Sequence, residues 1–182
     1  MNATVSTPVI PLPTARGHRF AVAGLGAFLA IALLGRYGFG GRGVIAAIFA
    51  VVLVLIAAID LERRIIPNRI VLPAIAIVLV AQIALYPGQA LEWVAAAVGT
   101  GLFFLIPMLF YPSGLGLGDV KLAVLLGAAL GTAVMGALLI GLVAAFVVAV
   151  FILVHKGGAG RKMAIPFGPF LAFGALVELL FM

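Results

Sequence analysis

The sequence predicts an all-α, polytopic membrane protein with about six to seven transmembrane helices. The chain of 182 residues is 66% hydrophobic and only 9% charged, whereas soluble domains are about half apolar and about a quarter charged. Its apolar residues gather in long runs, and most of these are near the ~20 residues that cross a bilayer as a helix. Its basic residues gather between the runs, as they do on the cytoplasmic side of membrane proteins.

The N-terminal segment is the first element. Residues 1–19, MNATVSTPVIPLPTARGHR, hold three prolines and no acidic residue, and we expect a disordered cytoplasmic tail there. A cleaved signal peptide is the alternative, because Arg16 and Arg19 precede an apolar run. That run continues into GRYGFGGRG without a convincing small-residue cleavage site, which favours a retained first span. Residues 20–182 then form one membrane-embedded domain.

The membrane part contains six apolar runs. They lie at about 20–35, 44–60, 70–86, 92–110, 120–154 and 167–182. The run 120–154 is too long for one span, since as a single helix it would measure about 50 Å. We expect a break at Gly131-Thr132, which gives a short span, 120–131, and a full one, 133–154.

The distribution of basic residues supports this break. With a cytoplasmic N-terminus and seven spans, only Arg36 and Arg42 lie outside. The nine basic residues inside are Arg16, Arg19, Arg63, Arg64, Arg69, Lys121, Lys156, Arg161 and Lys162. If 120–154 were a single span, the last three of these would lie outside, which the positive-inside rule disfavours. We expect residues 155–164 to form a mobile cytoplasmic loop, whose bases either contact anionic lipid head groups or act only as an ordinary positive-inside anchor.

Composition also excludes several function classes. The chain has no cysteine, so it cannot form a disulfide, use a thiol nucleophile or bind zinc through cysteine. Its two histidines, His18 and His155, each stand beside basic residues, and we expect no metal site and no cofactor. The net charge of +6 is spread over sparse bases, so membrane lipids are the expected partners and nucleic acid is not.

Three of the five acidic residues fit structural roles. Glu62 lies in a basic loop and can pair with its neighbours. Glu92 opens a span, where a negative charge is favourable at a helix N-terminus. Glu178 lies in the last run and can reach the outer interface.

The other two acids are Asp60 and Asp119. Taken alone, Asp60 could be an interface acid paired with Arg64, and Asp119 could be a helix N-cap. The predicted topology, however, puts both at the cytoplasmic face although 59 positions separate them. Ionisable groups at membrane depth are candidates for function. Two carboxylates that approach closely can share a proton and carry out acid–base hydrolysis, with one accepting a proton from water and the other donating one.

Alternating glycines lead into the second of these acids. The stretch YPSGLGLGD places Gly114, Gly116 and Gly118 directly before Asp119. These glycines lack the spacing and the preceding strand of a dinucleotide-binding fingerprint. They would instead let the backbone, and a substrate strand, approach the acid closely.

Three blocks of the sequence resemble the type IV prepilin peptidases. GLGD at 116–119, continuing as VKLAVLLGAALG, is similar to the GxGD signature of that family. Asp60, with the RRIIPNRIVLP that follows it, resembles the first-aspartate region. The ending IPFGPFLAFGA at 165–175 resembles the C-terminal block, and the likeness covers roughly 44–182.

The resemblance implies a membrane-embedded aspartic endopeptidase without a cofactor. Its substrates would be prepilins and pseudopilins, cut after a short basic leader at the cytoplasmic face of the bacterial inner membrane. Asp60 and Asp119 would be the catalytic pair. The remaining matched residues are the motif glycines Gly116 and Gly118, with Lys121, and the supporting residues Arg64, Pro67 and Asn68.

One departure from the family pattern concerns methylation. Larger bacterial members carry an N-terminal cytoplasmic domain with paired cysteines and also methylate the new N-terminus. This chain has no cysteine and only 19 residues before its first span. It resembles the short, protease-only branch that accompanies tight-adherence (Flp-type) pili, and we do not expect N-methyltransferase activity.

A second function class stays open at this point. A small polytopic transporter could use Asp60 and Asp119 as ion-coupling acids. It would place them near mid-membrane, beside broken helices.

Overall fold

The computed structural model describes residues 15–111, 115–156 and 165–181. Within these ranges the chain is helical and contains no strand. The helices are α1 (Ala15–Tyr37), α2 (Gly41–Arg63), α3 (Asn68–Leu85), α4 (Ala90–Phe110), α5 (Leu117–Leu130), α6 (Val134–Lys156) and α7 (Gly168–Phe181). Short 3₁₀ turns at Pro87–Gln89 and Gly131–Ala133 precede α4 and α6.

Each predicted span corresponds to one helix, and the all-α fold class is confirmed. The ends differ most at the N-terminus, where α1 begins at Ala15. Residues 15–19 are therefore helical and do not belong to a disordered tail. The three prolines of the N-terminal segment, Pro8, Pro11 and Pro13, oppose a helix, and all of them precede position 15. The helix can therefore extend back to this point. Residues 1–14 and most of the predicted basic loop, 157–164, lie outside the described residues.

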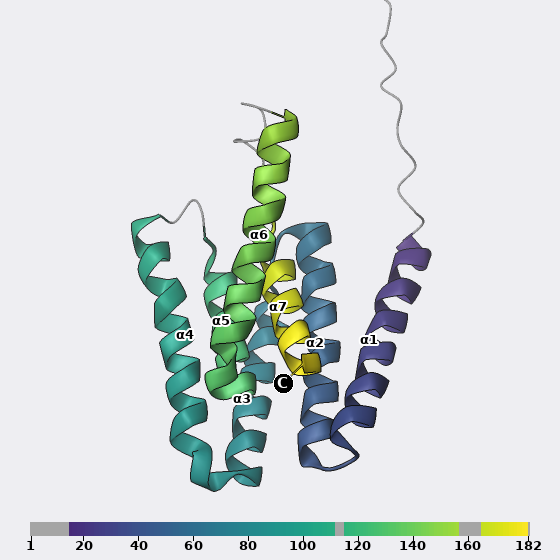
Figure 1. Ribbon diagram of the computed structural model, residues 1–182, viewed down its shortest axis with the longest axis vertical. Helices are drawn as coiled ribbons and strands as arrows, with labels where there is room; N and C mark the ends of the chain where they lie inside the picture. The colour runs from purple at the N-terminus through teal and green to yellow at the C-terminus, as the bar shows by residue number, and fades with distance from the viewer. Residues whose placement is uncertain (1–14, 112–114, 157–164, 182) are drawn as a thin grey trace, which may run out of the picture.

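The chain reverses direction between α5 and α6, as the glycine break predicts (Figure 1). Gly131 has φ +57° and ψ −134°, a conformation that side chains with a Cβ rarely adopt. Glu92 of α4 fixes this turn, because its Oε1 accepts hydrogen bonds from the Thr132 main-chain N–H (3.1 Å) and hydroxyl (2.8 Å). Glu92 therefore does more than place a negative charge in the first turn of its own helix.

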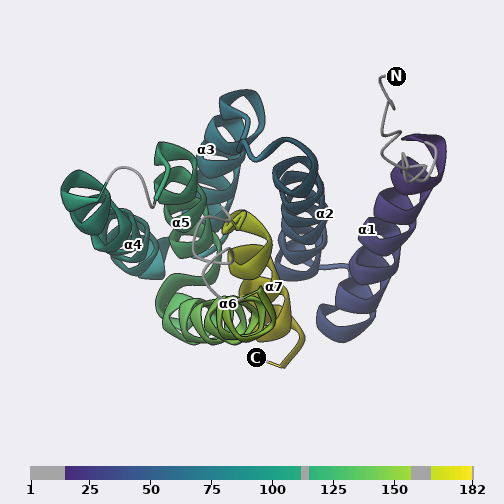
Figure 2. The ribbon, with the colours of Figure 1, turned by 90° about the horizontal axis from the view of Figure 1, so that it is seen from above.

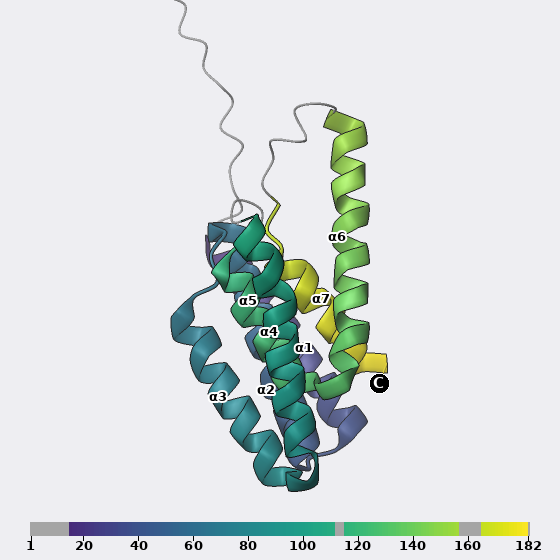
Figure 3. The same cartoon turned by 90° about the vertical axis from the view of Figure 1, so that its left-hand side faces the viewer.

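Five described stretches are long and apolar enough to cross a membrane. Four are α1, α2, α3 and α4 with its preceding turn, and the fifth is the continuous run Leu117–Lys156. The reversal at Gly131 divides that run into a 14-residue helix and a 23-residue helix. α7 is also 14 residues long and apolar. The result is a polytopic membrane bundle in which α6 projects beyond its neighbours at one end (Figure 3).

α7 lies inside the bundle, beside α2 and α6 (Figure 2). Its residues Leu171, Ala172 and Ala175 are fully or almost fully buried. Small residues let the backbones meet, since a Cβ at Gly174 would clash with the main-chain oxygen of Ala137 on α6. Packing of this kind is typical of membrane helices, which associate through close backbone contact.

Candidate active site

The candidate site lies where three helix ends meet at one end of the bundle. These are the C-terminal end of α2 and the N-terminal ends of α5 and α7 (Figure 1). Asp60 lies in the last turn of α2 and is only 4% exposed. Asp119 is the third residue of α5 and is half-buried. The loop between α2 and α3 and the segment before α5 complete this end of the molecule.

Both aspartates line one cavity of about 340 Å³. Most of the other residues matched by sequence line it as well: Arg64, Asn68, Gly116, Gly118 and Lys121. The structure thus brings together two sequence blocks that are far apart along the chain. Pro67 does not line the cavity. It is the N-cap of α3, and its carbonyl oxygen accepts hydrogen bonds from the N–H groups of Ile70 (3.0 Å) and Val71 (3.1 Å).

Asp60 is held by the start of α7. The main-chain N–H of Gly168 donates a hydrogen bond of 3.0 Å to Oδ2 of Asp60, and this contact is buried. A Cβ at position 168 would lie 2.7 Å from the same oxygen, so only glycine leaves room for the carboxylate. The start of α7 therefore fixes where the Asp60 side chain can lie.

Asp60 and Arg64 are joined through the main chain, and not by the side-chain ion pair that was the alternative interpretation of Asp60. Arg64 is the C-cap of α2 in the left-handed conformation (φ 54°, ψ 39°), and its N–H bonds the carbonyl oxygen of Asp60 over 2.8 Å. Within the described ranges, Oε1 of Glu62 lies 2.7 Å from Nδ1 of His18 on α1, and Glu62 does not pair with the neighbouring arginines as expected.

Asp119 is also not the N-cap of its helix. Gly116 is the N-cap, and its main-chain N–H donates a hydrogen bond of 3.1 Å to Oδ2 of Asp119. An acid three positions after the cap often reaches back in this way and stabilises the first turn. The contact also fixes the Asp119 carboxylate at the helix start, where the dipole favours negative charge.

Lys121 and Asn68 contact each other directly. The Lys121 Nζ donates a hydrogen bond of 2.8 Å to Oδ1 of Asn68. Lys121 belongs to α5 and Asn68 is the first residue of α3, so the bond joins the Asp119 block to the block that follows Asp60. Sequence reasoning matched both residues to the family pattern but did not predict this bond.

The two motif glycines have different surroundings. A Cβ at Gly118 would lie 2.9 Å from the Cβ of Ile66, so α5 can approach the α2–α3 loop only because this residue is glycine. A Cβ at Gly116 would meet the nearest atom, Oδ2 of Asp119, at an ordinary 3.5 Å. The close approach expected for these glycines therefore applies to Gly118.

Ile66 and Gly168 belong to the site, and sequence reasoning did not include them. Ile66 contacts both helix starts. Its Cδ1 lies 3.4 Å from the position of a Cβ at Gly168, and its Cβ lies against Gly118, so Ile66 lies between the starts of α5 and α7. The sequence did hold a signal for each. Ile66 precedes Pro67, which favours an extended backbone there, and Gly168 lies within the IPFGPF block.

The arrangement is suited to acid–base chemistry. It presents one buried and one half-buried carboxylate to the same cavity, where a water molecule and a peptide could reach both. The described residues contain no cluster of three or more His, Cys, Asp or Glu side chains that could hold a metal ion. Hydrolysis by a pair of carboxylates needs a water molecule between an acid and a base.

Comparison with known proteins assigns the family. The model of the type IV leader peptidase family matches residues 47–154, more than half of the chain. A curated protein of Xanthomonas campestris pv. campestris, called prepilin leader peptidase/N-methyltransferase, is 34% identical over 160 residues. The match covers 84% of this chain and 55% of that relative, so the chain spans about half the length of the protein it matches. No solved structure matches the chain. On these findings, the chain belongs to the type IV leader peptidase family.

Proposed function

We propose that the chain is an aspartic endopeptidase that removes the basic leader from prepilin-like substrates, with Asp60 and Asp119 as its catalytic pair. The observation that carries this proposal is the shared cavity, which both carboxylates line. Family membership supports the substrate class, because the relative is named as a prepilin leader peptidase.

The chemistry follows from two carboxylates with one water molecule between them. One carboxylate accepts a proton from water, which then attacks the scissile carbonyl carbon. The other donates a proton to the carbonyl oxygen, and later to the departing amine. No covalent intermediate with the protein is needed, and each carboxylate has a fixed position through its main-chain hydrogen bond.

The placement of the acids argues against transport. A transporter that coupled ions through Asp60 and Asp119 would hold them near the middle of the membrane. Asp60 instead lies in the last turn of α2 and Asp119 in the first turn of α5. This is a suitable depth for cutting a substrate next to its apolar segment.

The same end of the bundle is proposed to face the cytoplasm of a bacterium, across the inner membrane. Arg63, Arg64 and Arg69 lie exposed at this end, and the positive-inside rule assigns such residues to the cytoplasm. The leader of the substrate would then be cut before the rest of the pilin leaves the membrane. Within this family we propose the protease-only, Flp-type branch.

Two isosteric substitutions test the proposal. Asp60→Asn and Asp119→Asn remove an ionisable group with almost no change in volume. Each should lower cleavage of a prepilin by the purified protein in lipid bilayers at least about 100-fold, the usual contribution of one acid–base group. Glu178→Gln is the matched control, since it removes a carboxylate from α7 that does not line the cavity. Normal processing by either aspartate variant would contradict the catalytic assignment.

A further inference from the structure

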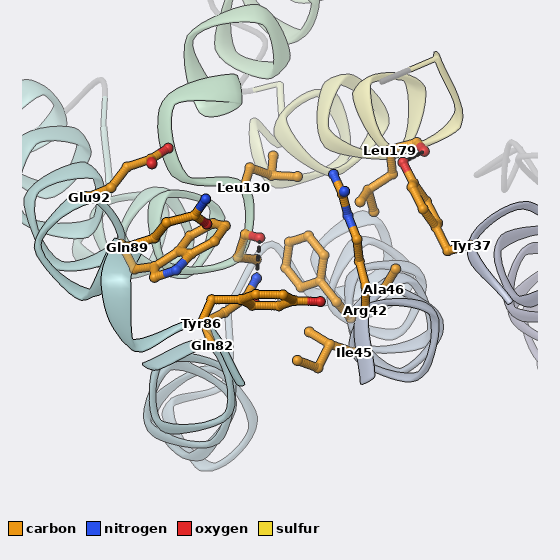
Figure 4. Close-up of a pocket in the computed structure, with 13 residues that line it drawn as sticks. Tyr37, Arg42, Ile45, Ala46, Gln82, Tyr86, Gln89, Glu92, Leu130 and Leu179 are labelled. Atoms are coloured by element: carbon orange, nitrogen blue, oxygen red, sulfur yellow. Dashed lines mark hydrogen bonds between the residues drawn. The ribbon is translucent and has the colours of Figure 1, made fainter. Parts of the chain in front are cut away.

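A second cavity lies at the end of the bundle opposite the aspartates. It encloses about 250 Å³, and residues from α1 to α5 and from α7 line it (Figure 4). Arg42 lines it and lies 18 residues before Asp60 on α2, about 27 Å away along the helix axis. The proposed peptidase function makes no use of this cavity.

Polar side chains of the cavity are held in place by contacts with the protein. Gln82 is 7% exposed and donates a hydrogen bond of 2.9 Å to the carbonyl oxygen of Ala129. Glu92 is anchored through Oε1 by Thr132. The Arg42 guanidinium stacks over the Tyr37 ring at 5.2 Å. A cavity with preorganised polar groups is suited to ligand binding, because little ordering is needed when the ligand arrives.

One donor in the lining has no partner among the described residues. The indole Nε1–H of Trp93 is buried from solvent and unbonded. Buried N–H groups are nearly always paired. Because this nitrogen is shielded from solvent, Trp93 contributes to the cavity through its ring, which lines the wall.

The charges of the cavity lie on opposite sides of it. Figure 4 shows Arg42 beside Leu179 on one side and Glu92 on the other, with Tyr86 and Gln89 between them. Arginine binds phosphate oxygens well, whereas a carboxylate and aromatic faces attract an ammonium group. The pattern is complementary to a zwitterion that carries a phosphate and a primary amine.

An apolar groove adjoins the polar cavity. It measures about 160 Å³, lies between α2 and α3, and is lined only by hydrophobic residues and Pro73. Phe49 lines both the groove and the polar cavity. A polar cavity with an apolar groove next to it fits an amphiphile better than a soluble zwitterion.

We propose that this end of the bundle binds one aminophospholipid. The phosphate lies at Arg42, the amine lies at Glu92, and an acyl chain occupies the α2–α3 groove. Aromatic and basic residues also occur at membrane interfaces without selecting a lipid. The proposal therefore requires selectivity for the head group, and it does not depend on the proposed peptidase activity.

Native mass spectrometry of the purified full chain tests the proposal. We expect phosphatidylethanolamine to bind more tightly than phosphatidylglycerol with the same acyl chains. Arg42→Gln should weaken phosphatidylethanolamine binding about tenfold or more, as expected for loss of a charged hydrogen bond. Arg36→Gln is the matched control, because Arg36 also lies over the Tyr37 ring, at 5.7 Å, but does not line the cavity. Equal binding by these two variants would overturn the proposal.

Two further arms test the amine site and the groove. Glu92→Gln keeps a carbonyl oxygen for Thr132 but removes the charge, so the preference for phosphatidylethanolamine over phosphatidylglycerol should disappear. A preference that persists would show that the amine lies elsewhere. Free phosphoethanolamine should bind at least about tenfold more weakly than the lipid, since it leaves the apolar groove empty. If it binds as tightly, the groove takes no part and the amphiphile assignment is wrong.

Fluorescence gives an independent readout. Trp93 is the only tryptophan in the sequence, so its emission reports on this cavity alone. Titration with short-chain phosphatidylethanolamine in detergent should shift the emission of the native chain and of Arg36→Gln. The same titration should leave Arg42→Gln unchanged at those concentrations. An identical shift in all three proteins would indicate unselective lipid contact and contradict the proposal.

Discussion

Gly168 and Asp60 are 108 residues apart in sequence and share a hydrogen bond of 3.0 Å. The bond runs from the first residue of α7 to a carboxylate in the last turn of α2. A Cβ at position 168 would clash with the Asp60 carboxylate, which accepts the hydrogen bond from the Gly168 N–H. The position of one candidate catalytic group therefore depends on the C-terminal helix.

Gly168→Ala should lower prepilin cleavage while the protein still inserts and folds. The added methyl group must displace the Asp60 carboxylate, and displacement of a reacting group by about 1 Å can cost about 100-fold in rate. Gly99→Ala is the control, since no atom lies within 4 Å of a Cβ there. Cleavage assays on both purified variants measure the difference. Equal activity would show that the Gly168 contact does not position Asp60.

Gly118→Ala and Gly116→Ala should have unequal effects. The first places a methyl group 2.9 Å from the Cβ of Ile66, and the second makes an ordinary contact at 3.5 Å. Overpacking of this kind costs about 1–3 kcal/mol, so Gly118→Ala should lower both unfolding free energy and cleavage. Gly116→Ala should cause the smaller loss, because it adds no close contact and gives up only the preference for glycine over alanine at an N-cap. The reverse order would contradict the packing described for α5.

Lys121 and Asn68 should be energetically coupled. Their bond is near the surface, where such contacts contribute about 0.5–1 kcal/mol. Denaturant unfolding of Lys121→Met, Asn68→Ala and the double variant forms a cycle that isolates the pair. Strictly additive losses would mean that the 2.8 Å contact does not join α3 to α5 in solution.

Arg64→Gly should be at least as stable as Arg64→Ala. Position 64 has a positive φ, which glycine adopts without steric cost and alanine does not. The expected difference in unfolding free energy is about 1 kcal/mol in favour of glycine. If alanine proves more stable, α2 does not end in the left-handed conformation.

Cleavage should not require S-adenosylmethionine, since hydrolysis by two carboxylates uses only water. The expectation of an unmethylated product is separate and stays a prediction. Mass spectrometry of product made with added methyl donor tests it. A product heavier by one methyl group, formed by the purified chain alone, would refute the protease-only assignment.

The helices were predictable because each apolar run is bounded by residues that stop a membrane helix. Pro67 follows the end of α2, and Gly131 breaks the long run between α5 and α6. The start of α1 was less predictable, because the boundary between a tail and a helix depends on weak local preferences near Ala15. The presence of each helix follows from the hydrophobicity of its residues, whereas its exact first and last residues do not.

The candidate site was predictable only in part. A shared face for Asp60 and Asp119 follows from topology, because one aspartate ends a helix and the other begins one. The contact between Gly168 and Asp60 depends on how α7 packs inside the bundle, which local sequence does not encode. The roles of Glu92 at the α5–α6 turn and of Ile66 between two helix starts have the same origin, since each joins segments far apart in the chain.

The central place of α7 bears on when activity can arise during biosynthesis. Ribosomes deliver helices in chain order, so α2 enters the membrane long before Gly168 has been translated. Until then the Asp60 carboxylate lacks its main-chain donor, and the wall that α7 gives to that part of the bundle is missing. We therefore expect the nascent chain to remain inert beside other proteins at the translocon, and to gain activity only when α7 has inserted.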